Sequence, residues 1–259
     1  MKIGVIGDSF IDRWHVGYTK GLSAEAPIPS VAIIDTLDFA GGAANVRVNL
    51  RSLGADAVLL MHPLEREQNY PIKNRLVAHG VQIARWDEKD YCTPYQPQDL
   101  IALLDCDALV VSDYGKGSLQ EEVIQHLRGV NIPLYVDTKS DPAPWLGAKN
   151  VTVFPNRKEY TEFKPSYDWF SKCVWKQGDG GMTFLSFGEP QIHASALAQN
   201  VKSVCGAGDT VLAMYVIMDL SGADGITSLN YANAAAAVVV EKDYTATTTF
   251  EEVVEILSR

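Results

Sequence analysis

The sequence offers little for cross-linking or for a structural metal. None of its four cysteines forms a C-x-x-C pair, and none of its five histidines forms an H-x-x-x-H pair. These absences argue against a structural zinc site. Isolated cysteines are typical of reduced thiols, so we expect a cytoplasmic setting.

Positive charge and long apolar runs are also scarce. The chain has 22 Lys and Arg against 32 Asp and Glu, a formal net charge of -10 and a pI near 4.9. Broad attraction to nucleic acid or to an anionic membrane is therefore not expected, and an anionic ligand would need a local site. No segment reaches the ~18 to 20 apolar residues of a membrane span, and the start "MKIGVIGDSF" is too short and polar for a signal peptide.

What the chain does contain is a recurring order of buried strand, loop and helix over 259 residues. Apolar runs predict strands, and apolar spacing of three and four predicts helices. We expect one α/β domain over 1–259, with a doubly wound, mostly parallel sheet flanked by helices. Strands are expected in "KIGVI", "SVAIIDTLDFAGG", "ADAVLLM", "ALVVSD", "PLYVDTK" and "VTVF", a hairpin in "CVWKQGDGGMTFLSF", and helices in "AANVRVNLRSLG", "EEVIQHLRG", 209–222, 228–241 and from Phe250.

Polar loops follow several of these strands. Open parallel sheets bind ligands at the carboxyl ends of their strands, so these loops are expected to meet at one edge. They are "GDSFIDRW", "GGAAN", "SDYGKG", "VDTKSD" and "PNRKE".

The stretch "GAGD" places Asp209 in the first turn of an expected helix. An aspartate there could simply cap the helix. It could instead act as a general base for a substrate hydroxyl, while the helix amides stabilise a transferring phosphoryl group.

Other polar residues also allow two interpretations. In "GGAAN", a tight turn explains the glycines, but a bare backbone and Asn45 would also suit a sugar. Asp12 could accept hydrogen bonds from vicinal hydroxyls, whereas Asp8 is expected to be a turn residue. Lys116 and Lys139 are either solvated lysines or phosphate ligands.

The pattern "PNRKE" pairs Asn156 with Glu159, three residues apart. At a helix start the two side chains would share a face. They could cap the helix at the surface, or they could hold hydrated Mg²⁺ and orient phosphates.

Taken together and in this order, the early "GD", "GGAAN", "NRKE" and "GAGDT" resemble the ribokinase-like (PfkB) family of carbohydrate kinases. Within it, "GDSFIDRWHVG", "LSAEAPIPSV", "FAGGAANVRVNLRSLGA", "LVVSDYGKGSL" and "YANAAAAVVV" are similar to the kinase domain that phosphorylates D-glycero-β-D-manno-heptose 7-phosphate in ADP-heptose synthesis. The resemblance covers nearly the whole chain. It implies an ATP- and Mg²⁺-dependent transfer of a phosphoryl group to a sugar hydroxyl.

The resemblance also implies roles for residues at matching positions. Asp209 would be the catalytic base, and the neighbouring amides would form an anion hole. The implied residues are Gly206, Ala207 and Gly208 for the anion hole; Asp12, Gly41, Gly42, Asn45 and Lys116 for the sugar and its phosphate; Asn156 and Glu159 for Mg²⁺, through water, and the nucleotide phosphates; and Gly178, Gly181 and Asn233 for ATP.

Segments near 28–40 and 71–88 resemble the small β lid of this family, which implies a homodimer formed through the lid. Two regions are shorter than the family pattern, one between "LLMHPLEREQNY" and "PIKNRLVAHG" and one between "NRKEYTEF" and "CVWKQGDGG". Lys176 and Gln177 stand where the subfamily usually has a Thr-Arg pair, and Cys205 stands where threonine is usual.

These departures leave three functions open. The leading hypothesis is a kinase for a heptose-7-phosphate-type substrate. The alternatives are a kinase for another sugar or nucleoside, and a catalytically weak relative that binds a sugar.

Overall fold

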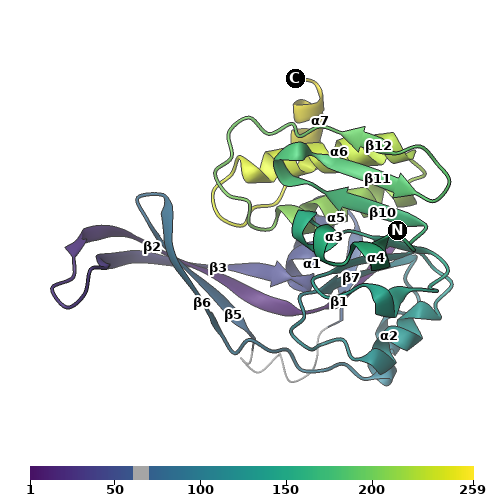
Figure 1. Ribbon diagram of the computed structural model, residues 1–259, viewed down its shortest axis with the longest axis horizontal. Coiled ribbons are helices and arrows are strands. Elements are labelled where there is room, and N and C mark those ends of the chain that lie inside the picture. The colour runs from purple at the N-terminus through teal and green to yellow at the C-terminus, as the bar shows by residue number, and fades with distance from the viewer. Residues whose placement is uncertain (61–69) are drawn as a thin grey trace.

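The computed structural model describes residues 1–60 and 70–259, and its main feature is an eight-stranded sheet (Figure 1). The strand order is β12-β11-β10-β9-β8-β7-β1-β4. Neighbouring strands from β10 to β4 pair in parallel, whereas β11 pairs antiparallel with both of its neighbours, β10 and β12. The strands are β1 (Lys2–Gly7), β4 (Asp56–Leu59), β7 (Ala108–Asp113), β8 (Leu134–Thr138), β9 (Val151–Val153), β10 (Lys172–Lys176), β11 (Met182–Ser186) and β12 (Ile192–Ala194).

Helices cover both faces of this sheet because its central strands are apolar on both sides. In β1, Ile3 and Val5 join one core cluster, whereas Ile6 joins the other. The first cluster contains residues of α1 (Ala43–Ser52), α5 (Ala207–Leu220), α6 (Gly225–Val240) and α7 (Phe250–Leu257). The second contains residues of α2 (Glu121–Arg128), α4 (Lys164–Tyr167) and the 3₁₀ helices η2 (Pro97–Leu103) and η3 (Ala143–Trp145), and Tyr160 of α3 (Arg157–Glu162) packs against it. The predicted doubly wound architecture is confirmed.

A separate four-stranded sheet, the lid, extends away from this body (Figure 1). Its order is β3-β2-β5-β6, with parallel pairing only between β2 and β5. The strands are β2 (Ser9–Leu22), β3 (Pro29–Gly42), β5 (Ile72–Ala78) and β6 (Val81–Glu88).

The lid corrects one sequence prediction. The stretch "GDSFIDRW" was predicted to be a loop, but from Ser9 onward it belongs to β2. The alternation typical of a strand is present, since Phe10, Asp12 and Trp14 are buried. A charged residue at one of the buried positions hid that alternation, and its burial becomes possible only through partners elsewhere in the chain. The segment 71–88 is two strands joined by a turn.

Most other predicted elements are confirmed, with shifted ends. Helix α5 begins two residues before Asp209, and α6 begins at Gly225 after the N-cap Asp224. Strand β12 was not predicted. Met61, at the end of one predicted strand, and much of the first shortened region fall in 61–69, outside the described residues. The second shortened region contains the four-residue helix α4.

Asp8, directly after β1, connects two loops that are distant in sequence. Its buried carboxylate accepts hydrogen bonds from the backbone amides of Tyr114, at 2.8 Å, Lys116, at 2.9 Å, and Ser118, at 3.1 Å. Strand β1 lies between β4 and β7, where the winding of the sheet changes direction. Asp8 therefore shapes the loop after β7 at the place where such sheets bind ligands.

We predict that Asp8→Asn lowers the free energy of unfolding by about 2–3 kcal/mol, because an amide nitrogen would then face backbone N–H donors. Urea denaturation measures this loss. Asp105→Asn is the matched control, since Asp105 is an exposed aspartate, and it should change stability by less than about 0.5 kcal/mol. An equally small effect of both substitutions would contradict this role of Asp8.

Candidate active site

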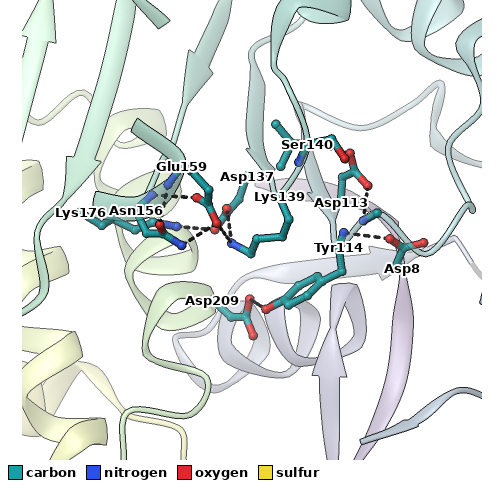
Figure 2. Close-up of polar contacts among 12 residues, drawn as sticks. Asp8, Asp113, Tyr114, Asp137, Lys139, Ser140, Asn156, Glu159, Lys176 and Asp209 are labelled. Atoms are coloured by element: carbon teal, nitrogen blue, oxygen red, sulfur yellow. Dashed lines mark hydrogen bonds and ion pairs between the residues drawn. The ribbon is translucent and has the colours of Figure 1, made fainter. Parts of the chain in front are cut away.

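Polar side chains from five neighbouring parallel strands gather at the carboxyl edge of the sheet (Figure 2). Each follows or ends its strand: Asp8 after β1, Asp113 in β7, Lys139 after β8, Asn156 after β9 and Lys176 in β10. Asp209 reaches the same edge from the start of α5 (Figure 2). The predicted meeting of these loops is confirmed.

The start of α5 is shaped by Gly206, which has a φ of 78°. This left-handed conformation favours glycine, and an added Cβ would lie 2.8 Å from the amide nitrogen of Asn45. The turn therefore brings the backbone close to Asn45. Asn45 Nδ2 donates a hydrogen bond to Asp209 Oδ2 at 2.7 Å, and the Tyr114 hydroxyl donates one to Asp209 Oδ1 at 3.2 Å.

Asp209 is buried, and its environment changes its acidity. Burial raises the pKa of Asp209 to about 6, although the Asn45 hydrogen bond and the cations of Lys139 and Lys176 act in the opposite direction. A carboxylate with a pKa near neutrality is suited to accept a proton. Asp209 is not the N-cap of α5. The N-cap is Gly206, and this helix start has no side-chain capping hydrogen bond.

A second buried carboxylate, Asp137, lies between two lysines (Figure 2). Lys139 Nζ is 2.9 Å from Asp137 and 3.1 Å from Glu159, and Lys176 forms an ion pair with the other oxygen of Asp137. Burial opposes ionisation of Asp137, but the two lysines outweigh it and hold its pKa below the ordinary value. The pKa of Lys139 is raised, because Asp137 and Glu159 outweigh the effect of burial.

Asn156 and Glu159 form a capping box at the start of α3. The backbone amide of Glu159 donates to Asn156 Oδ1 at 3.0 Å, and the backbone amide of Asn156 donates to Glu159 Oε2 at 2.8 Å. The capping interpretation from the sequence is confirmed, although Glu159 is buried rather than at the surface. Since Glu159 also contacts Lys139, the cap lies within the charged cluster.

The arrangement of carboxylates limits how a metal could bind. Within residues 1–60 and 70–259, no group of three or more His, Cys, Asp or Glu side chains could hold a metal ion. Both oxygens of Glu159 already have protein partners. These donors fit a hydrated ion contacted through water, since Mg²⁺ usually keeps several of its waters.

The glycines of "GGAAN" are required by packing. A Cβ on Gly41 would overlap the Phe10 ring, and one on Gly42, whose φ is 60°, would overlap the carbonyl oxygen of Asp8. Gly41 and Gly42 end β3 and α1 begins at Ala43, so the predicted tight turn is a direct strand-to-helix junction at these glycines.

Asp12 lies on the lid and already has partners. Its carboxylate accepts hydrogen bonds from Arg75, at 3.0 Å, and from Thr245, at 2.7 Å. The contact with Thr245 connects the lid to the loop after α6, whereas Arg75 belongs to the lid itself.

The sequence did not indicate a cationic cluster formed by Lys73 of the lid and Lys116 of the "SDYGKG" loop. Lys73 Nζ lies 4.0 Å from the centre of the Phe10 ring and 4.5 Å from that of Tyr114. The pKa of Lys73 is lowered to about 8, first by burial and then by the positive charges of Lys116 and Arg85. The pKa of Lys116 is also lowered, first by burial, although Lys116 forms an ion pair with Asp90.

The three residues assigned to the nucleotide lie around the hairpin of β10 and β11. Gly178 has a φ of 60° in the turn, and an added Cβ there would meet open space. Gly181 packs against the backbone around Ala194. Asn233 Nδ2 donates to the carbonyl oxygens of Ala194 and Ser195, so its side chain is fixed beside the same segment.

In the part of the chain that the structure describes, no helix is both long and apolar enough to cross a membrane.

Comparison with known proteins shows similarity to carbohydrate kinases. Residues 138–252 match the pfkB family carbohydrate kinase model, and this region includes Lys139, Asn156, Glu159 and Asp209. The chain is 33% identical to the bifunctional protein HldE of Pseudomonas paraeruginosa over an alignment of 284 residues including gaps, which covers 92% of the chain and 60% of that protein. It is 31% identical to HldE of Vibrio parahaemolyticus, covering 97% and 62%. The chain thus spans about three fifths of the length of these relatives.

Solved structures show the same fold at lower identity. Ribokinase of Arabidopsis thaliana, complexed with ribose and ATP, aligns with a TM-score of 0.77 and 15% identity over 99% of this chain and 98% of that one. Phosphofructokinase-2 of Escherichia coli, in complex with substrates and products, aligns with a TM-score of 0.76 and 16% identity over 100% and 99%. The chain therefore has the ribokinase-like fold, and its residues 138–252 match a PfkB carbohydrate kinase domain.

Proposed function

We propose that this chain is an ATP-dependent sugar kinase whose acceptor is a heptose-7-phosphate-type sugar. The observation that carries the proposal is Asp209, a buried carboxylate at the start of α5 whose pKa is raised to about 6. The positive charges of Lys139 and Lys176 act on it. The similarity to HldE proteins supports a heptose phosphate as the acceptor.

In the proposed reaction, Asp209 takes the proton of a sugar hydroxyl. The hydroxyl oxygen forms a bond to the γ-phosphorus, and the bond from that phosphorus to the bridging oxygen breaks, so that ADP leaves with the electron pair. The amides of Gly206, Ala207 and Gly208, at the positive end of α5, stabilise negative charge on the transferring group. Asn45 holds the Asp209 carboxylate in position through its hydrogen bond.

ATP and Mg²⁺ are the proposed cofactors. When bound, Mg²⁺ would neutralise charge on the nucleotide phosphates. Glu159 would contact the hydrated ion through water, and Asn156 would stand beside the phosphates. Gly178, Gly181 and Asn233 would line the nucleotide site around the hairpin of β10 and β11.

The cationic cluster of Lys73 and Lys116 supports a phosphorylated acceptor. Each of these lysines has a lowered pKa, and each lies near the Phe10 ring. Two ammonium groups held close together in an acidic protein are stabilised by an anion bound between them. Asp90 now pairs with Lys116, and a substrate phosphate would compete with it. Asp12, Gly41, Gly42 and Asn45 would contact the sugar itself.

The lid suggests how the site excludes water and how the chain assembles. A lid that closes over the sugar would limit hydrolysis of ATP. Its outer strands β3 and β6 have unpaired edges within the described lid sheet, and Leu22, Ile33 and Ile34 are exposed. Such edges favour pairing with a second copy, so we propose a homodimer formed through the lid.

The proposed base leads to a first prediction. Asp209→Asn should lower kcat by 10²–10⁴, because the amide cannot accept the proton. In the wild type, kcat/KM should fall about tenfold per pH unit below about pH 6, since protonated Asp209 cannot act as a base. A coupled ADP-release assay with heptose 7-phosphate measures both effects, and excess chelator in the same assay tests the need for Mg²⁺.

The matched control is Asp219→Asn, a substitution near the other end of α5, where Asp219 accepts a hydrogen bond from Tyr135. It should change kcat by less than about twofold. Turnover by the Asp209 variant within about tenfold of the wild type would show that Asp209 is not the base.

The lysine cluster leads to a second prediction. Lys116→Met and Lys73→Met should each raise KM for heptose 7-phosphate at least tenfold, since a hydrogen bond to a charged group contributes about 1.5–3 kcal/mol. Neither should change KM for the same heptose without its phosphate. Lys20→Met, which removes an exposed lysine of the lid, serves as the control.

A panel of acceptors in that assay separates the alternatives. Phosphorylation of ribose, fructose or a nucleoside, but not of the heptose phosphate, would replace the proposed substrate. Sugar binding without nucleotide binding, measured by calorimetry, would favour a catalytically weak sugar-binding relative.

A third prediction concerns assembly. Ile34→Lys should convert a dimer to a monomer, because Ile34 is a lid residue that is 70% exposed and a charge would have to be buried there. Sedimentation velocity measures the change. Phe187→Lys alters an exposed apolar residue of the body and should leave the dimer intact. A wild type that stays monomeric at every concentration would exclude the lid dimer.

A further inference from the structure

Lys176 is fixed beside the anion hole by its strand. It ends β10, is only 9% exposed, and its backbone amide donates to the carbonyl oxygen of Pro155 at 2.8 Å. The nearest atom that a Cβ on Gly208 would meet is Lys176 Nζ, at 3.6 Å. The ammonium group therefore lies against the backbone that immediately precedes Asp209, and it points into the charged cluster (Figure 2).

The ion pair with Asp137 does not explain why a second lysine is buried here. Removing an ammonium group from water is unfavourable unless it gains close partners. Lys176 has Asp137, but Asp137 is already paired with Lys139. A neutral residue at position 176 would leave Asp137 with a partner, so neutralising Asp137 does not require Lys176.

The charges of the cluster show what Lys176 adds. Lys139 and Lys176 balance Asp137 and Glu159, and Asp209 adds one negative charge. Without Lys176, three carboxylates would surround one lysine where an anionic phosphoryl group has to bind. A positive charge next to Gly208 reduces that repulsion at the position where charge develops during transfer.

We propose that Lys176 is a catalytic residue whose ammonium group contacts the non-bridging oxygens of the transferring phosphoryl group. This rests on the proposed kinase function. Lys176 keeps its proton throughout, while the hydroxyl proton passes to Asp209 and ADP leaves. Asp137 holds Lys176 in position, and Lys139 keeps Asp137 ionised when the Lys176 ammonium turns toward the phosphoryl group.

Steady-state kinetics with ATP and heptose 7-phosphate is the first test. Lys176→Met should lower kcat about 10²–10³-fold, the usual effect of removing one group that stabilises transition-state charge, and should change KM for the sugar less than about threefold. The kcat of Lys176→Arg should be at least tenfold higher than the kcat of Lys176→Met. Lys172→Met, at the other end of β10, should leave kcat within about twofold of the wild type.

A second measurement does not depend on the acceptor. In calorimetry with Mg²⁺ and ADP, adding aluminium fluoride as a mimic of the transferring group should tighten binding to the wild type. For Lys176→Met this gain should be at least tenfold smaller, whereas the affinity for ADP alone should stay within about threefold. Lys176→Thr should behave in the same way if the methionine variant does not fold.

The outcomes separate the two proposals. An active wild type together with unchanged kcat and an unchanged aluminium fluoride gain in the variants would show that Lys176 has a structural role only. A wild type that binds ADP and aluminium fluoride but phosphorylates none of the acceptors would refute the proposed function, and the calorimetry would still decide the role of Lys176. A wild type that binds no ADP would overturn both.

Discussion

The hydrogen bond from Asn45 to Asp209 joins the starts of α1 and α5, which are far apart in the sequence. It is supported from behind, because Asn49 Nδ2 donates to the Asn45 carbonyl oxygen at 2.9 Å and Thr210 Oγ1 donates to Asn49 Oδ1 at 2.8 Å. All four side chains are buried. Since a buried polar group without a partner is destabilising, each residue of this hydrogen-bonded series holds the next one in position. The "GGAAN" and "GAGDT" loops are thereby positioned against each other, and the other site residues are placed around them.

The two buried aspartates of the site show how similar groups acquire different properties. Both experience the cost of burial, yet the pKa of Asp209 is raised and that of Asp137 is lowered. Asp209 has a neutral amide and a hydroxyl as its hydrogen-bond donors, whereas Asp137 has two ammonium groups. Environments that separate two pKa values in this way assign different roles to two carboxylates. Asp209 can exchange a proton near neutral pH, and Asp137 stays ionised as an anchor for lysines.

The sequence could predict the edge at which the site lies but not its full set of contacts. Parallel strands share one direction, so the loops after β1, β7, β8 and β9 had to meet, and the predicted residues Asp209, Asn45, Asn156 and Glu159 do lie there. Local patterns cannot show how far a side chain reaches. Asp8 was predicted to shape its own turn, yet it binds a loop 106 residues away. Lys73 was missed because its place beside Phe10 depends on how β5 pairs with β2, and β2 itself was hidden by a buried charge at Asp12.

The register of the sheet explains why the placement of the central site does not depend on the second shortened region, which contains α4. Gly7 is aligned with Ser112, and Ser112 with Asp137, so one row of residues crosses β1, β7 and β8 just before the loops of the candidate site begin. Backbone hydrogen bonds between neighbouring strands set this row, and they do not involve the segment after α3. Among the described strands β4 is at the end of the sheet, and α4 packs Tyr167 against the helical side of the second core cluster. A shorter segment after α3 changes the covering of the sheet, whereas the positions of Asp8, Asp137 and Lys139 are fixed by β1 and β8, which pair through β7.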